Sequence, residues 1–213
     1  LMLTPLLLVR RGELARGRPS EVARFLGIFF LLGAGFMLVE VSLLQQLFLF
    51  LGAPTLTFAV VLCNILAFTG FGSFVSRRFP LNRLHRWIPG AALVSVAVLG
   101  AAYLAVPSLI DAAQGAPLWV RLLLVLPVMA IIATPMGTLF PSCVRLLAWK
   151  QLDLTCWSWG MNGVGSVLGS VGASLLALNL GISAVFLCGT IFYVGLLVLA
   201  LFLNNERTVQ ETA

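Results

Sequence analysis

Six apolar runs, each long enough to cross a lipid bilayer, set what this chain can fold into. We expect helices over residues 25–51, 55–75, 88–106, 118–139, 157–178 and 183–203. A spanning helix needs about 20 apolar residues, whereas a spanning strand alternates apolar and polar residues over about 10. Only 9% of the residues are charged, against about 25% in a soluble domain. The pattern predicts an all-α, polytopic transmembrane helix bundle with six complete spans.

The chain opens inside a shorter apolar stretch, residues 1–9. Nine helical residues reach only about 14 Å, so we expect a partial N-terminal helix whose beginning lies upstream, in a longer protein. This gives three regions. Residues 1–24 are a partial helix and basic cytoplasmic linker, 25–203 a six-helix transmembrane domain, and 204–213 a polar, disordered cytoplasmic tail.

Basic residues mark alternate connections between the runs. Twelve of the 13 Lys and Arg residues lie before the first run or after the second, fourth and sixth, and Arg121 is the exception. Because Lys and Arg concentrate in cytoplasmic loops, we expect these connections and the C-terminus on the cytoplasmic side of a bacterial inner membrane. The net charge of +6 is explained by this membrane topology. It therefore does not indicate a basic patch that binds nucleic acid.

No set of residues points to catalysis or to a bound metal or cofactor. The four cysteines, Cys63, Cys143, Cys156 and Cys188, form no CxxC pair, and the single His85 lies in a connection. Metal sites need clustered ligands, so we interpret the cysteines as small buried apolar residues. No nucleophile–base pair or carboxylate pair is visible. We therefore expect no enzyme activity from these residues.

Glu40 is the acidic residue that lies deep inside an expected span. An ionised carboxylate at the bilayer centre costs about 2.5–3.5 kcal/mol, so Glu40 should face protein. The second helix places Asn64 at a similar depth, which makes Asn64 the candidate partner. Gln45 lies nearer the outer end, where we expect contact with water. Two interpretations of Glu40 stay open: a proton or substrate site, or a neutral carboxyl that joins helices.

Small residues predict close helix packing. Gly165, Gly169 and Gly172 form a stripe on the fifth helix, and Gly33 lets another backbone approach the first. A ligand groove is the alternative use of this stripe. Asn162 lies about 8 Å from the cytoplasmic end of its helix and is a further polar candidate. In the fourth helix the prolines predict a kink or an early end.

Four runs are similar to the C-terminal membrane region of bacterial membrane-bound spermidine-synthase-like proteins: residues 33–45, 50–55, 135–141 and 157–170. The resemblance implies helices like those of the major facilitator class, around a cytoplasmic aminopropyltransferase-like domain. That domain's glycine-rich loop and acidic residues are absent from this sequence, so no synthase residue is carried over. Ser76 stands where the facilitator loop usually has an acid.

Two functions follow from these features. We favour a structural or accessory subunit of a larger membrane assembly, because a packing stripe is present and catalytic residues are not. The alternative is half of a major-facilitator-like carrier for a small or cationic solute, related to polyamines by the resemblance. Six helices equal one facilitator half, and alternating access needs two halves. The expected partners are therefore the lipid bilayer and either other membrane subunits or a missing N-terminal half.

Overall fold

The computed structural model describes residues 19–150, 152 and 154–210, and within them the chain is helical. The expected partial helix at residues 1–9 lies outside this range. The helices are α3 (Pro19–Leu51), α4 (Pro54–Ser76), the 3-10 turn η1 (Leu81–Arg83), α5 (Leu84–Ala113), α6 (Leu118–Trp149), α7 (Thr155–Leu180) and α8 (Ile182–Gln210). Six of them are long and apolar enough to cross a membrane. The predicted fold class, a helical membrane bundle, is confirmed.

Helix α6 does not end early, which corrects the expected end at Leu139. It continues through Pro135 and Pro141 to Trp149. Each proline removes one backbone hydrogen bond, but apolar positions 139, 143, 146 and 147 keep the helical period and are buried. Packing along this face therefore carries the helix past both prolines.

The first part of the expected disordered tail is also helical, because α8 continues to Gln210. Residues 204–210 contain neither proline nor glycine. Extending an existing helix adds one hydrogen bond per residue without a new nucleus. A polar sequence therefore does not by itself end the helix at the edge of an apolar run.

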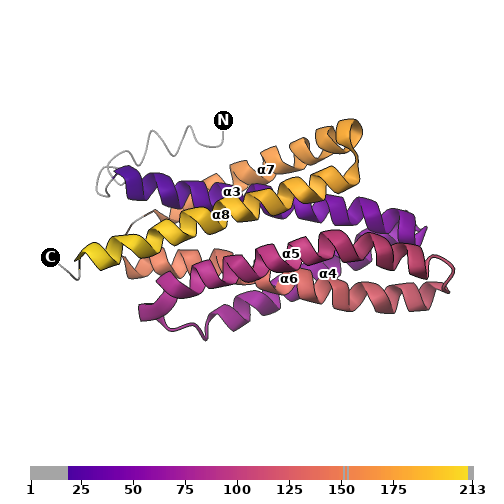
Figure 1. Cartoon of the computed structure of the whole chain (residues 1–213), viewed down its shortest axis with the longest axis horizontal. Helices are drawn as coiled ribbons and strands as arrows, with labels where there is room; N and C mark the ends of the chain where they lie inside the picture. The colour runs from indigo at the N-terminus through magenta and orange to yellow at the C-terminus, as the bar shows by residue number, and fades with distance from the viewer. Residues whose placement is uncertain (1–18, 151, 153, 211–213) are drawn as a thin grey trace.

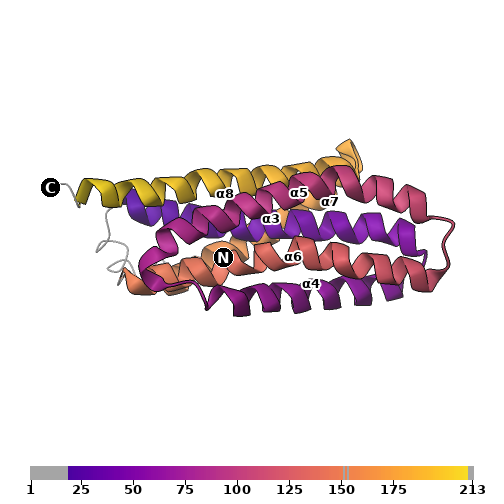
Figure 2. The same ribbon diagram turned by 60° about the horizontal axis from the view of Figure 1, so that its bottom comes forward.

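The helices form two groups of three, and α5 of one group also packs against α8 of the other. Helix α3 packs against α7 and α8, and α6 packs against α4 and α5; the two groups lie above and below one another in Figure 1. Figure 2 shows α4 and α6 side by side. The first helix of each triplet, α3–α5 and α6–α8, thus packs against the second and third helices of the other. Since three helices reverse the direction of the chain, the triplets have opposite orientations, as in inverted-topology repeats.

Glycines set the close crossing of α3 and α7. A Cβ on Gly165 would lie 2.3 Å from the Phe30 carbonyl oxygen, and one on Gly169 would lie 2.7 Å from the Ala34 carbonyl oxygen. On the facing side, a Cβ on Gly33 would lie 2.1 Å from the Asn162 carbonyl oxygen. These separations leave no room for a side chain, so the two backbones are in contact.

Gly172 is not part of this crossing, although the sequence grouped it with Gly165 and Gly169. A Cβ there would meet nothing within 4 Å. Ala173 is buried instead. The contact row advances by four residues at each step, from 165 to 169 to 173, which is one of the two ridge directions of a helix surface.

The α4–α6 pair has an equivalent crossing that the sequence analysis did not identify. A Cβ on Gly72 would lie 2.1 Å from the Thr134 carbonyl oxygen, and one on Gly137 would lie 2.3 Å from the Thr69 carbonyl oxygen. Each group of helices therefore contains a pair whose backbones meet at glycines, α3 with α7 in one group and α4 with α6 in the other.

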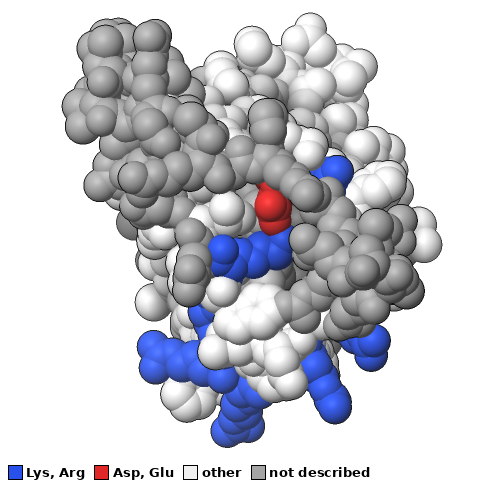
Figure 3. Space-filling model, turned by 90° about the vertical axis from the view of Figure 1, so that its left-hand side faces the viewer, with Lys and Arg blue, Asp and Glu red and all other residues white. Residues whose placement is uncertain are grey.

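The two ends of the bundle differ in charge. Figure 3 shows Lys and Arg side chains gathered at the end that holds the start of α3 and the α4–α5 connection, which we call the basic end. There Lys150 forms an ion pair with Glu21. At the opposite end, Arg121 donates to the carbonyl oxygens of Ala116 and Phe50, at 2.8 Å each, and to that of Gln114. Backbone oxygens thus accommodate the one basic residue that departs from the alternation.

Candidate functional site

A groove of about 730 Å³ runs between the two glycine crossings, from the basic end toward the middle of the bundle. Side chains from α3, α4, α6 and α7 form its walls, together with Tyr193 of α8. Binding pockets for small molecules have volumes of about 300–1,000 Å³. The residues that line it are Leu32, Gly33, Phe36, Leu66, Thr69, Gly70, Ser73, Ser76, Arg77, Met136, Gly137, Phe140, Pro141, Val144, Arg145, Trp159, Asn162, Ser166 and Tyr193.

Two arginines stand at the basic end of the groove. The Arg145 guanidinium donates through Nη1 to the Ser76 carbonyl oxygen, at 2.5 Å, and through Nη2 to that of Phe79, at 3.0 Å. These two bonds fix the half-buried Arg145 beside the end of α4. Arg77 is exposed and also lines the groove. A guanidinium has five N–H donors, so Arg145 retains donors for a ligand.

Hydroxyl groups on α4 also line the groove, Ser76 beside the arginines and Thr69 two turns further along the helix. Thr69 Oγ1 donates to the Ile65 carbonyl oxygen at 2.6 Å, and Ser76 Oγ donates to that of Ser73 at 2.7 Å. Their protons are therefore used within the helix, while their oxygens can still accept. Neutral polar groups of this kind can orient a solute without adding charge to the span.

The α3–α7 crossing brings Asn162 to the groove wall. Its amide Nδ2 donates to the Phe29 carbonyl oxygen at 3.3 Å, and its backbone lies against Gly33. Asn162 therefore has a packing role in this crossing while one side of it lines the groove. The structure shows no contact between Asn162 and Glu40 in the described range.

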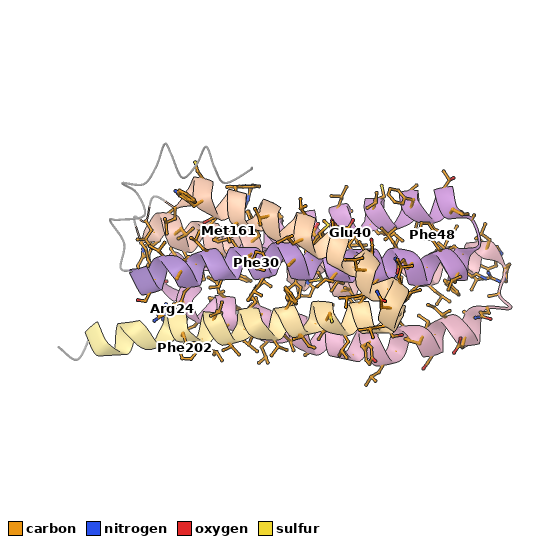
Figure 4. All side chains as sticks on the ribbon, turned by 90° about the horizontal axis from the view of Figure 1, so that it is seen from above. Arg24, Phe30, Glu40, Phe48, Met161 and Phe202 are labelled. Atoms are coloured by element: carbon orange, nitrogen blue, oxygen red, sulfur yellow. The ribbon has the colours of Figure 1, made fainter. Side chains whose placement is uncertain are left out.

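Glu40 lies beyond the inner end of the groove. Figure 4 shows it along α3 between Phe30 and Phe48. It is half-buried and lines a small separate cavity whose walls include Phe36 and Met136. The same two side chains line the groove. Phe36 and Met136 thus form a shared wall between the groove and the cavity at Glu40.

Asn64 is not the partner of Glu40, which corrects the sequence-based pairing. Its amide Nδ2 donates to the Val60 carbonyl oxygen of its own helix at 2.7 Å. Asn side chains often bond in this way to the preceding turn, so Asn64 is satisfied without reaching α3. In the described part of the chain, Glu40 has no hydrogen-bonding or ionic partner.

Gln45 also differs from the expectation. Its Oε1 atom is buried and accepts no hydrogen bond from the described residues, whereas we expected contact with water. Its neighbour Gln46 donates to Ser42 Oγ, which in turn donates to the Ile182 carbonyl oxygen, at 3.1 Å each. Gln46 therefore connects α3 to the start of α8 through Ser42, whereas Gln45 is half-buried.

The cysteines are not uniformly buried. Cys143 is buried and Cys188 half-buried, but Cys63 and Cys156 are exposed on the protein surface. Apolar lipid can cover a thiol as well as protein can, because a free cysteine behaves as a small hydrophobe. An apolar run therefore does not tell which of its cysteines face the protein interior.

Most of the residues that line the groove were not predicted as site residues from the sequence. Arg145 was placed in a connection, because the fourth helix was expected to end at Leu139. The helical spacing of apolar residues continues past Pro141, and this spacing could have indicated that the helix extends to Arg145. Trp159 is 60% exposed and packs edge to face against Phe140, with the ring centroids 4.7 Å apart. Nothing local in the sequence indicates that these two rings meet.

Comparisons of the chain with protein-family models, with curated proteins and with solved structures found no match. The resemblance to spermidine-synthase-like membrane regions therefore stays a prediction, and the function is argued from the fold and the groove.

Proposed function

We propose that this chain is one half of a membrane carrier and that the groove between α3, α4, α6 and α7 holds the solute. The observation that carries the proposal is the exchanged pairing of two inverted triplets around that groove. Transporters with inverted repeats hold their solute near the repeat interface and alternate access by rocking one unit against another.

The position of the groove supports the same proposal. It lies between two helix pairs, each held by its own glycine contact. Its walls combine apolar side chains with neutral hydroxyls and two arginines. Solute sites are typically concave and mainly apolar, with a few convergent polar groups. A second half, either another copy or a partner chain, would close the open side.

The accessory-subunit interpretation stays a prediction, but one of its supports is gone. One feature that favoured it was the small-residue stripe of α7, which predicts close helix packing. Gly165 and Gly169 contact α3 of the same chain. We therefore place the carrier first, and the accessory role becomes the outcome expected if transport is absent.

Uptake by the protein reconstituted into vesicles tests the proposal. The protein is purified in mild detergent with whatever chains accompany it, and flux is measured for a panel of organic anions, amines and neutral solutes. The carrier predicts saturable uptake of at least one class above that of protein-free vesicles. Folded protein that transports none of them, and that co-purifies stoichiometrically with other membrane subunits, would establish the accessory role instead.

Glu40→Gln is expected to abolish accumulation driven by a pH gradient while exchange of solute across the vesicle membrane continues. An ionisable side chain inside a span commonly serves as a proton relay, and Glu40 lies directly behind the groove wall. The neutral amide keeps the shape of the side chain but cannot exchange a proton. Equal gradient-driven accumulation by Glu40→Gln and the unaltered protein would show that Glu40 has a packing role only.

A further inference from the structure

We infer that the groove binds an amphipathic anion, with its charged headgroup at Arg77 and Arg145 and its apolar tail directed toward Phe36 and Met136. The inference rests on the proposed function in that it concerns the same groove, and it names the class of solute. It differs from the cationic solute that the family resemblance implies.

The charge of the lining favours an anion. Arg77 and Arg145 both line the basic end, and no Asp or Glu does so among the residues that the structure describes. A guanidinium offers several donors in one plane, which suits the oxygens of a carboxylate or phosphate. Arg145 is already held by the Ser76 and Phe79 carbonyl oxygens, so little side-chain freedom is lost when a ligand binds.

The deeper lining favours an apolar tail. Past the arginines, the walls include Phe36, Leu66, Met136 and Phe140. The neutral hydroxyls of α4 add no formal charge there. A small hydrophilic anion would leave this apolar surface in contact with water. An aliphatic tail would cover the surface and stabilise the complex by about 25 cal/mol for each Å² of apolar area buried.

A cation fits the same groove less well. The rings of Phe36, Phe140 and Trp159 can attract a cation through their faces, but Phe140 and Trp159 already pack against each other. A cation entering from the basic end would also pass both guanidinium groups. Glu40 lines the separate cavity behind Phe36 and not the groove.

Binding of a fluorescent amphiphile tests the inference. The probe is dansylamino-undecanoate, added to the purified full-length protein in phosphatidylcholine nanodiscs, and its neutral methyl ester and the matching dansyl amine serve as comparison probes. Energy transfer from the exposed Trp159 reports occupancy of the groove, and the Trp159→Phe variant provides the background from the other tryptophans. We expect the carboxylate probe to bind at least about tenfold more tightly than the ester or the amine.

Arg77→Gln should weaken binding of the carboxylate probe by about tenfold, since it removes one charge-assisted contact. The matched control is Arg86→Gln, an exposed arginine at the same end that does not line the groove. It should bind the probe like the unaltered protein. Arg145→Gln should weaken binding further, but it also loses the contacts to α4, so Arg77→Gln is the deciding variant.

The source of the natural amphiphile is resolved by the lipid composition of the nanodisc. If the headgroup belongs to a membrane lipid, replacing part of the phosphatidylcholine by phosphatidylglycerol should displace the probe. If it belongs to a free amphiphile, phosphatidylglycerol should leave probe binding unchanged while unlabelled undecanoate displaces it. Both results support an amphipathic anion. Equal affinity for carboxylate and ester, or equal losses in Arg77→Gln and Arg86→Gln, would overturn it.

Failure of this inference is distinguishable from failure of the carrier proposal. Anion binding that depends on Arg77, without uptake of any solute, would leave the site in place and contradict transport. Saturable uptake of amines or neutral solutes without anion binding would leave the carrier in place and contradict the anionic solute.

Discussion

Gly165→Leu is expected to prevent the bundle from assembling. A Cβ at this position lies 2.3 Å from the Phe30 carbonyl oxygen and 3.1 Å from the Ala34 backbone nitrogen. Both atoms belong to the backbone, so no side-chain rotation can make room, and α3 and α7 must separate. Overpacking of a core typically costs about 1–3 kcal/mol, and a backbone clash belongs at or above the top of that range. The expected result is loss of the monodisperse peak in detergent size-exclusion chromatography.

Gly163→Leu is the matched control for that experiment. It makes the same change two residues away on α7, where a Cβ would meet nothing within 4 Å. The control should keep the elution profile and the thermal unfolding midpoint of the unaltered protein. If both variants behaved alike, whether stable or unstable, the α3–α7 backbone contact would not be what holds this group of helices together.

Gly70→Leu should produce a folded protein that no longer transports. Gly70 lines the groove, and a Cβ there would meet nothing within 4 Å. A leucine at this position extends into the groove without displacing backbone, in contrast to one at Gly72, which would meet the Thr134 carbonyl oxygen. We expect uptake to fall to the level of protein-free vesicles with little change in thermal stability.

Gly100→Leu serves as the control for groove filling. Gly100 lies on α5 away from the groove, and a Cβ there also meets nothing within 4 Å. Uptake should be retained in this variant. Normal uptake by Gly70→Leu would mean that the solute passes elsewhere in the bundle.

The number and type of the helices follow from the sequence because the bilayer imposes one simple requirement. A segment in hydrocarbon must satisfy its own backbone hydrogen bonds, so an apolar run of sufficient length predicts a helix without any knowledge of its neighbours. The ends of α6 and α8 could not be placed in the same way. Prolines such as Pro141 are tolerated where packing continues beyond them, and the apolar positions after it were the available signal.

Only some residues of the candidate site could be predicted from the sequence. Gly33, Gly165 and Gly169 could be assigned to close packing, because small residues four apart allow helices to approach. The pairing of Glu40 with Asn64 used depth alone. Depth says nothing about which helices are neighbours or which way a side chain turns. The groove depends on the contact of α4 with α6, and that arises from tertiary pairing of Gly72 with Gly137.

The side of the membrane on which each connection lies tests the account most directly. The native cysteines are replaced, single cysteines are introduced at Asn82 and at Gly115, and sealed membrane vesicles are treated with an impermeant maleimide. A chain that crosses the bilayer with its basic end on one side should be labelled at Asn82→Cys and Gly115→Cys from opposite faces. Labelling of both positions from the same face would contradict the six-span bundle and, with it, the groove between its helix pairs.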